Sequence, residues 1–405
     1  MKHFTGYEYT MIDIANHMGL DKETFEVRIK WVEDNMADLE SLVPKAHNPI
    51  LFAKGVFALR DAQNGIPTGH MIGLDACASG PQIMGAIVGC ERTCAATGLI
   101  HPDIRSDLYS DVVGAMNKHL IAEHQLTLGT SVSRDDVKEA TVPFFYGSTA
   151  APKRVFVDNS PAYVAYFNAM ADVAPGAVNL ISELQMAWQP FALAHEWTLP
   201  DGYKAHVKVM EAVDIKIEID ELDHATFTHR FYENAGAETG LSLAANVVHS
   251  IDGMIVREMN RRCNYEREKL QRVLHIIDKH TYLEQQLGAK ILSRSKFISL
   301  GMVEAITPST VGNFETLDLL RLAEIIERTL LRKSFPVICV HDEFKCAPNN
   351  MNILRQTYID IMAELAESCI LADILAEITG TPHKQKKPNN PTLGSKIRKS
   401  NYGLS

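Results

Sequence analysis

The stretch that most constrains this chain is an apolar run that ends in an aspartate and continues with small residues. Residues 71–80 read MIGLDACASG, in which Asp75 follows the apolar positions. These positions predict a short buried strand with Asp75 at its end. A carboxylate at a strand end, followed by small residues, can hold a hard divalent cation and leave coordination positions open for a substrate.

A second apolar run ends in the same way much later in the chain. Residues 337–341 read VICVH and predict another buried strand, directly followed by Asp342. Two aspartates on adjacent strands, with substrate phosphates completing the coordination shells, form the core of a two-metal nucleotidyl-transfer site. Taken singly, each aspartate is equally well an ordinary acidic residue, because the chain contains 50 Asp and Glu residues. The segments around them therefore decide the interpretation.

Length and composition are those of a globular protein. The 405 residues, 46% hydrophobic and 22% charged, suffice for a large core and two or three domains. No apolar run is long enough to span a bilayer, and no signal segment is evident. The seven cysteines lack disulfide spacing, which predicts reduced thiols and a cytosolic location. The net charge of −10 argues against a protein that coats nucleic acid, but not against an enzyme with one basic channel.

A predicted helix between the two aspartates carries two cations on one face. Arg134 and Lys138 are four residues apart, and Tyr146 follows two turns later. A cationic pair with an aromatic ring at the helix end suits a triphosphate and a base or sugar. The alternative is an exposed Arg/Lys pair and a core tyrosine. Pro143 is expected to kink the helix just before Tyr146.

Apolar spacing predicts helices over much of the chain and a long hairpin in the middle. Helices are expected at residues 25–32, 48–60, 107–124, 160–195, 257–280, 283–298, 317–333 and 350–380, with Pro175-Gly176 breaking the stretch 160–195. A turn at 197–203 and alternating Val and Ile residues at 207–219 predict the hairpin, whose far end is acidic and polar.

The order of these motifs resembles the single-subunit RNA polymerases of phages and mitochondria. The resemblance rests on four motifs, which are Asp75 with Ser79, Gly80 and Gln82; Arg134 and Lys138 with Tyr146-Gly147-Ser148; His249-Ser250 with Asp252-Gly253; and His341-Asp342. Residues 6–35 resemble the palm segment upstream of the first motif, and residues 400–405 resemble the terminal foot of the family. The resemblance thus spans nearly the whole chain.

This resemblance implies an α+β fold of the polymerase right-hand type. The palm, an antiparallel sheet with helices, is expected to comprise residues 1–103 and 250–405. The mostly helical fingers are expected at 104–249, with the hairpin at about 205–237. The second palm part is expected to hold a helical insertion at about 258–320 and the foot. The thumb, the N-terminal domain and the Asp-x-x-Gly-Arg motif of the family have no counterpart in this sequence.

The resemblance also implies DNA-directed RNA synthesis, in the cytoplasm of a bacterial host. Asp75, Asp342 and the Ala76 carbonyl would hold two Mg²⁺ ions. The implied groups for substrate binding are Arg134, Lys138, Tyr146, Ser79, Gly80 and Gln82. Lys138 would also protonate the leaving pyrophosphate, and Tyr146, supported by His249, would sense the ribose 2′-hydroxyl.

Three residues depart from the family pattern. Glu139 stands where a second cation is usual, Pro143 interrupts the fingers helix, and Glu343 follows Asp342 as in repair-type DNA polymerases. Two alternatives therefore stay open, a DNA polymerase of the related palm family and a non-catalytic nucleic-acid-binding subunit. Those DNA polymerases carry a glutamate five residues after the first aspartate, where Gly80 leaves room for ribose. The retained aspartates argue against a non-catalytic subunit.

The missing parts imply partners beyond the DNA template, the RNA product and nucleoside triphosphates. A smaller polymerase subunit is expected to supply the N-terminal and thumb parts. It is expected to dock near residues 1–35, on apolar faces around Ile12, Ile14 and Trp31. The acidic hairpin predicts poor reading of duplex DNA, and therefore an accessory single-stranded-DNA-binding recruitment factor.

Overall fold

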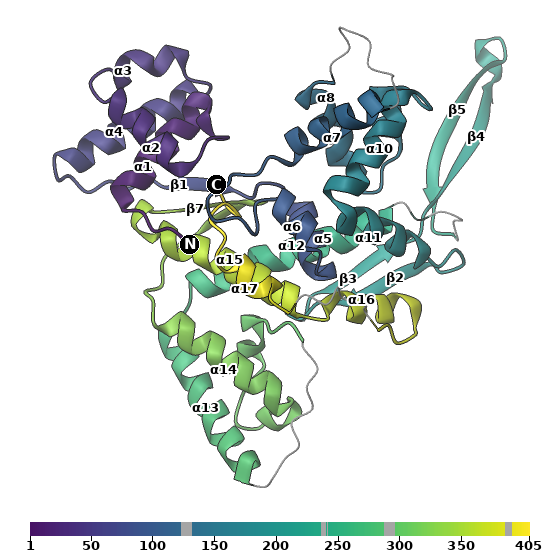
Figure 1. Ribbon diagram of the computed structural model, residues 1–405. Coiled ribbons are helices and arrows are strands. Elements are labelled where there is room, and N and C mark those ends of the chain that lie inside the picture. The colour runs from purple at the N-terminus through teal and green to yellow at the C-terminus, as the bar shows by residue number, and fades with distance from the viewer. Residues whose placement is uncertain (123–131, 236–239, 241, 287–295, 385–390) are drawn as a thin grey trace.

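The computed structural model describes residues 1–122, 132–235, 240, 242–286, 296–384 and 391–405 (Figure 1). At its centre lies a small antiparallel sheet of three strands in the order β1-β7-β6. The strands are β1 (Ile72–Asp75), β6 (Ile338–Val340) and β7 (Glu343–Cys346). Helices surround this sheet, so the mixed α+β class expected from the sequence is confirmed.

The sheet corrects the predicted strand order. Both strands preceding the aspartates exist, but they are not adjacent, because β7 lies between them and pairs with each. Asp75 on β1 is paired with Glu343 on β7. Strand β6 was expected to be buried and is instead an exposed edge strand, with Ile338 49% and Val340 47% exposed.

Four helices form a lobe beside β1 (Figure 1). They are α1 (Gly6–Ala15), α2 (Phe25–Asp34), α3 (Leu39–Leu42) and α4 (Pro49–Gln63), with a 3₁₀ turn at Val43–Lys45. Thr5 caps the start of α1 with a capping box. After α1, the left-handed conformation of Gly19 (φ 106°) interrupts the helical backbone within the π-helical turn Asn16–Leu20. Ile12 and Ile14 have no exposed surface. The expectation that they form a docking face is therefore wrong, because they fill the core of this lobe.

A second helical region follows the sheet on the other side. It contains α5 (Ser79–Val88), α6 (Glu91–Ala96), α7 (Leu108–Ala122), α8 (Arg134–Phe144), α9 (Ala150–Phe156), α10 (Pro161–Val173) and α11 (Pro175–Met186). The helical stretch predicted over 160–195 ends at Met186, and the break predicted at Pro175-Gly176 is confirmed as the boundary between α10 and α11. Pro175 separates them because proline lacks the N–H that a helix interior requires, whereas it is tolerated at a helix start.

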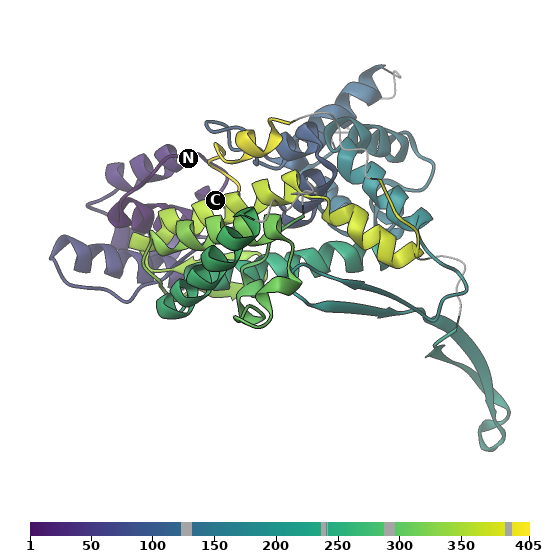
Figure 2. The same cartoon turned by 90° about the horizontal axis from the view of Figure 1, so that it is seen from below.

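The predicted hairpin is two successive hairpins. Strand β2 (Ala194–Thr198) pairs with β3 (Lys204–Lys208), and β4 (Glu211–Ile219) pairs with β5 (Ala225–Glu233) around the 3₁₀ turn Asp220–Leu222. Figure 2 shows β4 and β5 projecting from the body of the molecule.

The remaining helices differ from their predicted bounds at breaks and at one start, since the helix predicted from residue 257 begins at Ser242. They are α12 (Ser242–Cys263), α13 (Arg267–Gln286), α14 (Thr316–Leu330), α15 (Met351–Glu367), α16 (Ile370–Thr379) and α17 (Leu393–Ile397), with 3₁₀ turns at Leu300–Glu304, Val311–Asn313 and Pro348–Asn350. The predicted helices 257–280 and 350–380 are each interrupted by a short break. The helix predicted at 283–298 falls largely outside the described residues.

Helices α13 and α14 form a unit with its own hydrophobic cluster, separate from the main core. This unit lies below the sheet in Figure 1. It falls partly within the insertion expected at 258–320, but it extends to the end of α14.

Residues 400–405 pack against the end of β1. Leu404 forms an antiparallel bridge with Ala76, and the Ser405 N–H donates to the Asp75 carbonyl at 2.9 Å. The seven cysteines are free thiols, as predicted, and Cys94 is buried in the core. Within the described residues, no helix combines the length and apolar character needed to cross a bilayer.

Candidate active site

A cavity of about 570 Å³ lies where the sheet, α5 and α8 meet. It brings together eight of the predicted site residues, which are Asp75, Ala76, Ser79, Gly80, Arg134, Lys138, Tyr146 and Asp342. They come from segments far apart in the sequence, so the fold assembles the site. Gln82 and His249 do not line this cavity.

The backbone places Asp75 and Asp342 side by side although their strands are not adjacent. The Ala76 N–H donates to the Asp342 carbonyl at 3.1 Å. Asp342 occupies the two-residue turn between β6 and β7, in which His341 has a φ of 55°. Few residues with a side chain adopt this left-handed conformation, which is typical of tight hairpin turns. The turn therefore fixes Asp342 beside the end of β1.

Four carboxyl groups gather at this point, and their charges interact. Surrounding protein atoms desolvate the Asp75 carboxyl, although part of its side chain is open to the cavity. This desolvation, followed by the charges of Glu343 and Asp342, raises the pKa of Asp75 to about 6. Burial and then the charge of Asp342 raise the pKa of Asp252 on α12 to about 6 as well. Clustered carboxylates that raise each other's pKa are suited to a hard divalent cation, which would relieve the repulsion.

Sequence reasoning gave no role to Asp252 or Glu343. Glu343 forms an ion pair with Lys345 at 2.8 Å. A Cβ atom on Gly73 would lie only 2.1 Å from the Glu343 carboxylate, so this glycine lets the glutamate cross the face of β1. The sequence signal that could have identified Glu343 was its position directly after Asp342. For Asp252, the signal was its place in the motif that also contains His249.

The end of α8 fixes the position of Tyr146. Ser133 begins the helix with a capping box to Asp136. At the other end, the Gly147 N–H donates to Phe144 and the Ser148 N–H donates to Pro143, with Gly147 at a φ of 86°. These bonds form a Schellman motif, in which glycine supplies the left-handed residue. The helix continues through Pro143 to Phe144, so the predicted interruption before Tyr146 is confined to its last turn.

Tyr146 lies between Gly80 and His249. Its ring centroid is 4.6 Å from that of His249, at an interplanar angle of 48°. A Cβ atom on Gly80 would lie 3.8 Å from the Tyr146 hydroxyl oxygen. Burial and the charges of Asp252 and Asp342 raise the pKa of the half-buried Tyr146. A hydroxyl beside a glycine, at the edge of an acidic cluster, can distinguish small differences in a sugar.

The two predicted cations have different surroundings. Arg134 donates to both carboxylate oxygens of Asp107, at 2.6 and 3.0 Å, and its guanidinium lies 5.3 Å from the Tyr109 ring centroid. Its charge is therefore compensated within the protein. Lys138 is exposed and lines the cavity. The unexpected Glu139 accepts a hydrogen bond from Arg154 at 2.8 Å and does not line the cavity. Lys22 and Arg105 also line it, and sequence reasoning missed both.

Gln82 is a correction to the predicted substrate-binding set. Its side chain has no exposed surface. The amide nitrogen donates to the Thr97 and Gly403 carbonyls at 2.8 and 3.1 Å, and the amide oxygen accepts from Tyr358 at 2.7 Å. Gln82 therefore ties α5 to the residues 400–405 segment and is not available to a substrate.

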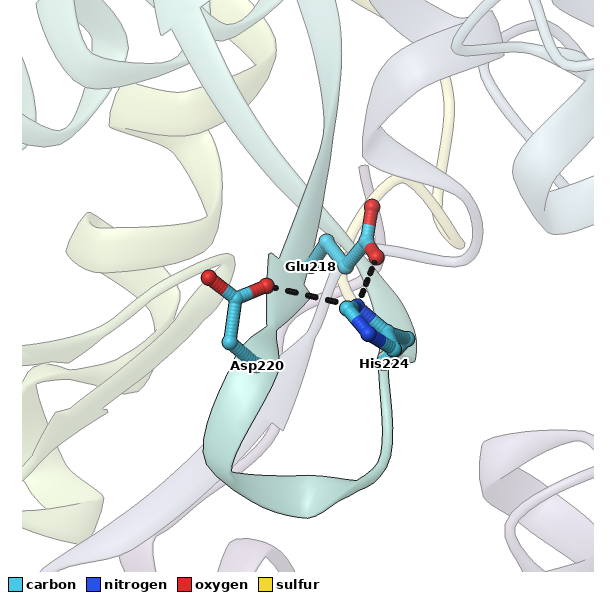
Figure 3. A group of neighbouring side chains, drawn as sticks. All are labelled: Glu218, Asp220 and His224. Atoms are coloured by element: carbon cyan, nitrogen blue, oxygen red, sulfur yellow. Dashed lines mark hydrogen bonds and ion pairs between the residues drawn. The ribbon is translucent and has the colours of Figure 1, made fainter.

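A second acidic group lies elsewhere. Glu218, Asp220 and His224 are the one set of three or more such side chains, among the described residues, that is spaced to share an ion (Figure 3). All three are exposed at the tip of the β4–β5 hairpin. This set does not include Asp75 or Asp342, so the carboxyl groups at the cavity are not spaced as a group of three around one ion.

Comparison with known proteins places this site in context. Residues 3–181 match the model of the family described as DNA-dependent RNA polymerase. The DNA-directed RNA polymerase of Pseudomonas phage phiKMV is 23% identical in an alignment of 301 residues, which covers 61% of this chain and 37% of that protein. The matched segment thus covers little more than a third of the phage enzyme. Residues 3–181, which contain Asp75, Lys138 and Tyr146, are accordingly similar to DNA-dependent RNA polymerases.

Proposed function

We propose that this chain is the catalytic subunit of a DNA-directed RNA polymerase of the single-subunit phage type. One observation carries the proposal. Asp75, Asp342, Lys138 and Tyr146, on separate elements, line one cavity. The likeness of residues 3–181 to RNA polymerases supports the same assignment. On this proposal the central sheet with its helices is the palm, residues 104–249 are the fingers, and α13–α14 are an insertion in the palm.

The donor set at the cavity fits two Mg²⁺ ions. Asp75 and Asp342 lie next to each other, and their mutual repulsion favours a cation between them. Both carboxylates, with the Ala76 carbonyl, would hold the ions. When bound, Mg²⁺ would activate the 3′-hydroxyl of the growing RNA and neutralise the triphosphate.

The other side chains would bind and orient the nucleotide. Lys138 is exposed in the cavity, where it would bind the phosphates and donate a proton to the leaving pyrophosphate. Arg134, held by Asp107, would extend this positive region. Tyr146, backed by His249, would contact the ribose, with Ser79 and Gly80 leaving space for its 2′-hydroxyl.

The proposal includes partners. A smaller subunit would supply N-terminal and thumb parts, giving a heterodimer. It would dock near residues 1–35 through exposed or half-buried side chains such as Trp31, since Ile12 and Ile14 are internal. A single-stranded-DNA-binding factor would recruit the enzyme to DNA in the host cytoplasm.

Primer extension tests the proposal. The assembled enzyme is given a primed DNA template, Mg²⁺, and either ribonucleotides or deoxyribonucleotides. We expect RNA extension, and a fall of roughly 100-fold or more for Asp342→Asn, as for loss of a ligand to a catalytic metal. Asp38→Asn, an exposed residue outside the cavity, is the matched control.

Two other outcomes would reject the proposal. Preferential use of deoxyribonucleotides would indicate a DNA polymerase, the second candidate, which Glu343 beside Asp75 favours. Nucleic-acid binding without extension, in both the unaltered protein and Asp342→Asn, would indicate a non-catalytic subunit.

A further inference from the structure

The β4–β5 hairpin stands apart from the rest of the molecule (Figures 1 and 2). Its two strands pair continuously from Glu211↔Glu233 to Ile219↔Ala225. Nine residues in each strand give an arm of about 30 Å at the usual rise of a β-strand. Within the described residues, no third strand pairs with either of them.

One face of this arm is apolar. Directly paired residues project to the same face of a two-stranded sheet. Four successive pairs on this face are Val213↔Phe231, Ile215↔His229, Ile217↔Phe227 and Ile219↔Ala225, and the acidic pair Glu211↔Glu233 continues the face at the base of the arm. Ile215 is 46%, Ile217 37% and Phe227 48% exposed. A contiguous row of large exposed apolar side chains is uncommon on a free surface and marks an interaction site.

The opposite face is mainly polar, although it also carries the exposed Tyr232 opposite Ala212. Arg230 donates two hydrogen bonds to Asp214 across the strands, both at 2.7 Å. Lys216 and Glu218 are paired with Thr228 and Thr226 on the same face. The arm is therefore amphipathic, and its apolar side is the one that lacks a partner within the described residues.

The charge of the arm identifies the kind of partner. Residues 211–233 contain seven acidic residues and two residues that are Lys or Arg. At the tip, the His224 imidazole forms ion pairs with Glu218 at 2.6 Å and Asp220 at 3.4 Å (Figure 3). This excess of negative charge repels nucleic-acid phosphates and a second copy of the same arm. It attracts lysine and arginine side chains on another protein.

We propose that the apolar face of the β4–β5 arm docks into an apolar groove of a second protein, whose rim carries lysines and arginines around the acidic tip. The apolar side chains would supply most of the binding energy, and the charges would set the orientation and speed of association. This interface is independent of whether the cavity synthesises RNA.

Photo-cross-linking from the arm tests this interface in the organism that makes the protein. A photoreactive phenylalanine derivative replaces Phe227 on the apolar face, and Thr228, its neighbour on the opposite face, is the control position. We expect one protein to be captured from position 227 and not from 228. Equal capture from both faces, capture of nucleic acid, capture of a second copy, or no capture would each overturn the proposal.

Binding by the purified components completes the test. The captured protein is titrated with the full chain, and 1:1 binding is expected to weaken at least tenfold with Ile217→Ser and as salt increases. Lys216→Ser, on the opposite face, should change affinity less than threefold. Circular dichroism checks that both variants remain folded. Equal losses for the two variants, or affinity independent of salt, would reject an apolar interface with a basic rim.

Discussion

The Tyr146 hydroxyl oxygen lies 3.8 Å from the point where a side chain on residue 80 would begin. Because only a glycine stands there, the hydroxyl is free to meet a substrate group in the cavity. Replacing Tyr146 by Phe removes that oxygen and keeps the ring, which packs against His249. We expect RNA synthesis to continue, while discrimination against deoxynucleotides weakens by about 1–3 kcal/mol, as for a lost polar contact.

The measurement is the ratio of kcat/KM for ribo- and deoxynucleoside triphosphates. Tyr163→Phe, which removes a hydroxyl outside the cavity, is the control and should leave the ratio unchanged. Unchanged discrimination in Tyr146→Phe would assign Tyr146 to packing alone.

Asp252 should make the stability of the metal-free protein depend on pH. Its pKa is about 6 in the folded protein against the ordinary value of 3.8 for an aspartate, so the folded state binds protons more tightly than the unfolded state. Its contribution is therefore most favourable below about pH 4, and is lost as pH rises through about 6. We expect Asp252→Asn to flatten the fall of Tm between pH 4 and 6.5 measured in a chelator. The exposed Asp38→Asn should retain the slope of the unaltered protein, and an unchanged slope in Asp252→Asn would contradict the raised pKa.

At the scale of elements, the end of α8 depends on one glycine. Gly147 is buried and has a φ of 86°, so an added Cβ strains the turn that carries Tyr146. We expect Gly147→Ala to destabilise the protein by about 1 kcal/mol or more and to reduce nucleotide affinity. Gly114 lies inside α7 with open space around it, so Gly114→Ala should be neutral or stabilising by up to about 1 kcal/mol. Denaturant unfolding of the two variants checks the contrast, which equal effects would refute.

The α13–α14 unit should unfold separately from the main core. Its hydrophobic cluster is distinct, and Leu322 in α14 has no exposed surface. We expect Leu322→Ala to cost about 2–5 kcal/mol, the range for a buried leucine. Hydrogen exchange should show the loss of protection in α13 and α14, with little change in α5 and α15. Leu331, 86% exposed, supplies the control Leu331→Ala. Loss of protection throughout the protein would show a single cooperative core.

Local periodicity explains which elements were predictable. The helix predicted at 107–124 is α7 (Leu108–Ala122), and the strand ending at Asp75 is β1. Strand β7 was missed because four residues after a turn carry too little pattern, and nothing local shows which strands they join. The same limit applies to Ile12, since an apolar face on a helix does not reveal whether its partner is another protein or the same chain.

At the scale of the molecule, most of the predicted site residues line the cavity, but their arrangement was not predictable. Asp75 and Asp342 were identified from strand ends, and the fold brings both into one cavity. The two segments are joined by the hydrogen bond from the Ala76 N–H to the Asp342 carbonyl, beside the turn in which His341 is left-handed. No local residue pattern predicts that hydrogen bond. Gln82 was misassigned because a sequence motif gives the position of a residue but not the direction in which its side chain points. The Gln82 amide points into the core, where it accepts a hydrogen bond from Tyr358.

The charge and shape of the whole molecule bear on how it finds DNA. Phosphate contacts by lysine and arginine supply most non-specific affinity for a duplex, and arginine pairs with guanine in the major groove. The projecting β4–β5 arm, which is placed to reach outward, instead carries seven acidic residues and the single arginine Arg230, already paired with Asp214. A protein of net charge −10 with such an arm is expected to have low electrostatic affinity for duplex DNA.

On the function proposed above, we therefore expect the assembled protein to initiate RNA synthesis poorly on linear duplex DNA that carries its own promoter, and well on the same sequence as a single strand. The single strand needs no melting, and its bases are accessible without a groove-reading arm. Run-off transcription without helper proteins, with the two templates at equal concentration and moderate salt, measures the ratio. Pre-melted duplex is the matched control and should behave like the single strand. Efficient, sequence-specific initiation on intact duplex would show that the enzyme reads promoter DNA unaided, and would remove the need for a recruitment factor.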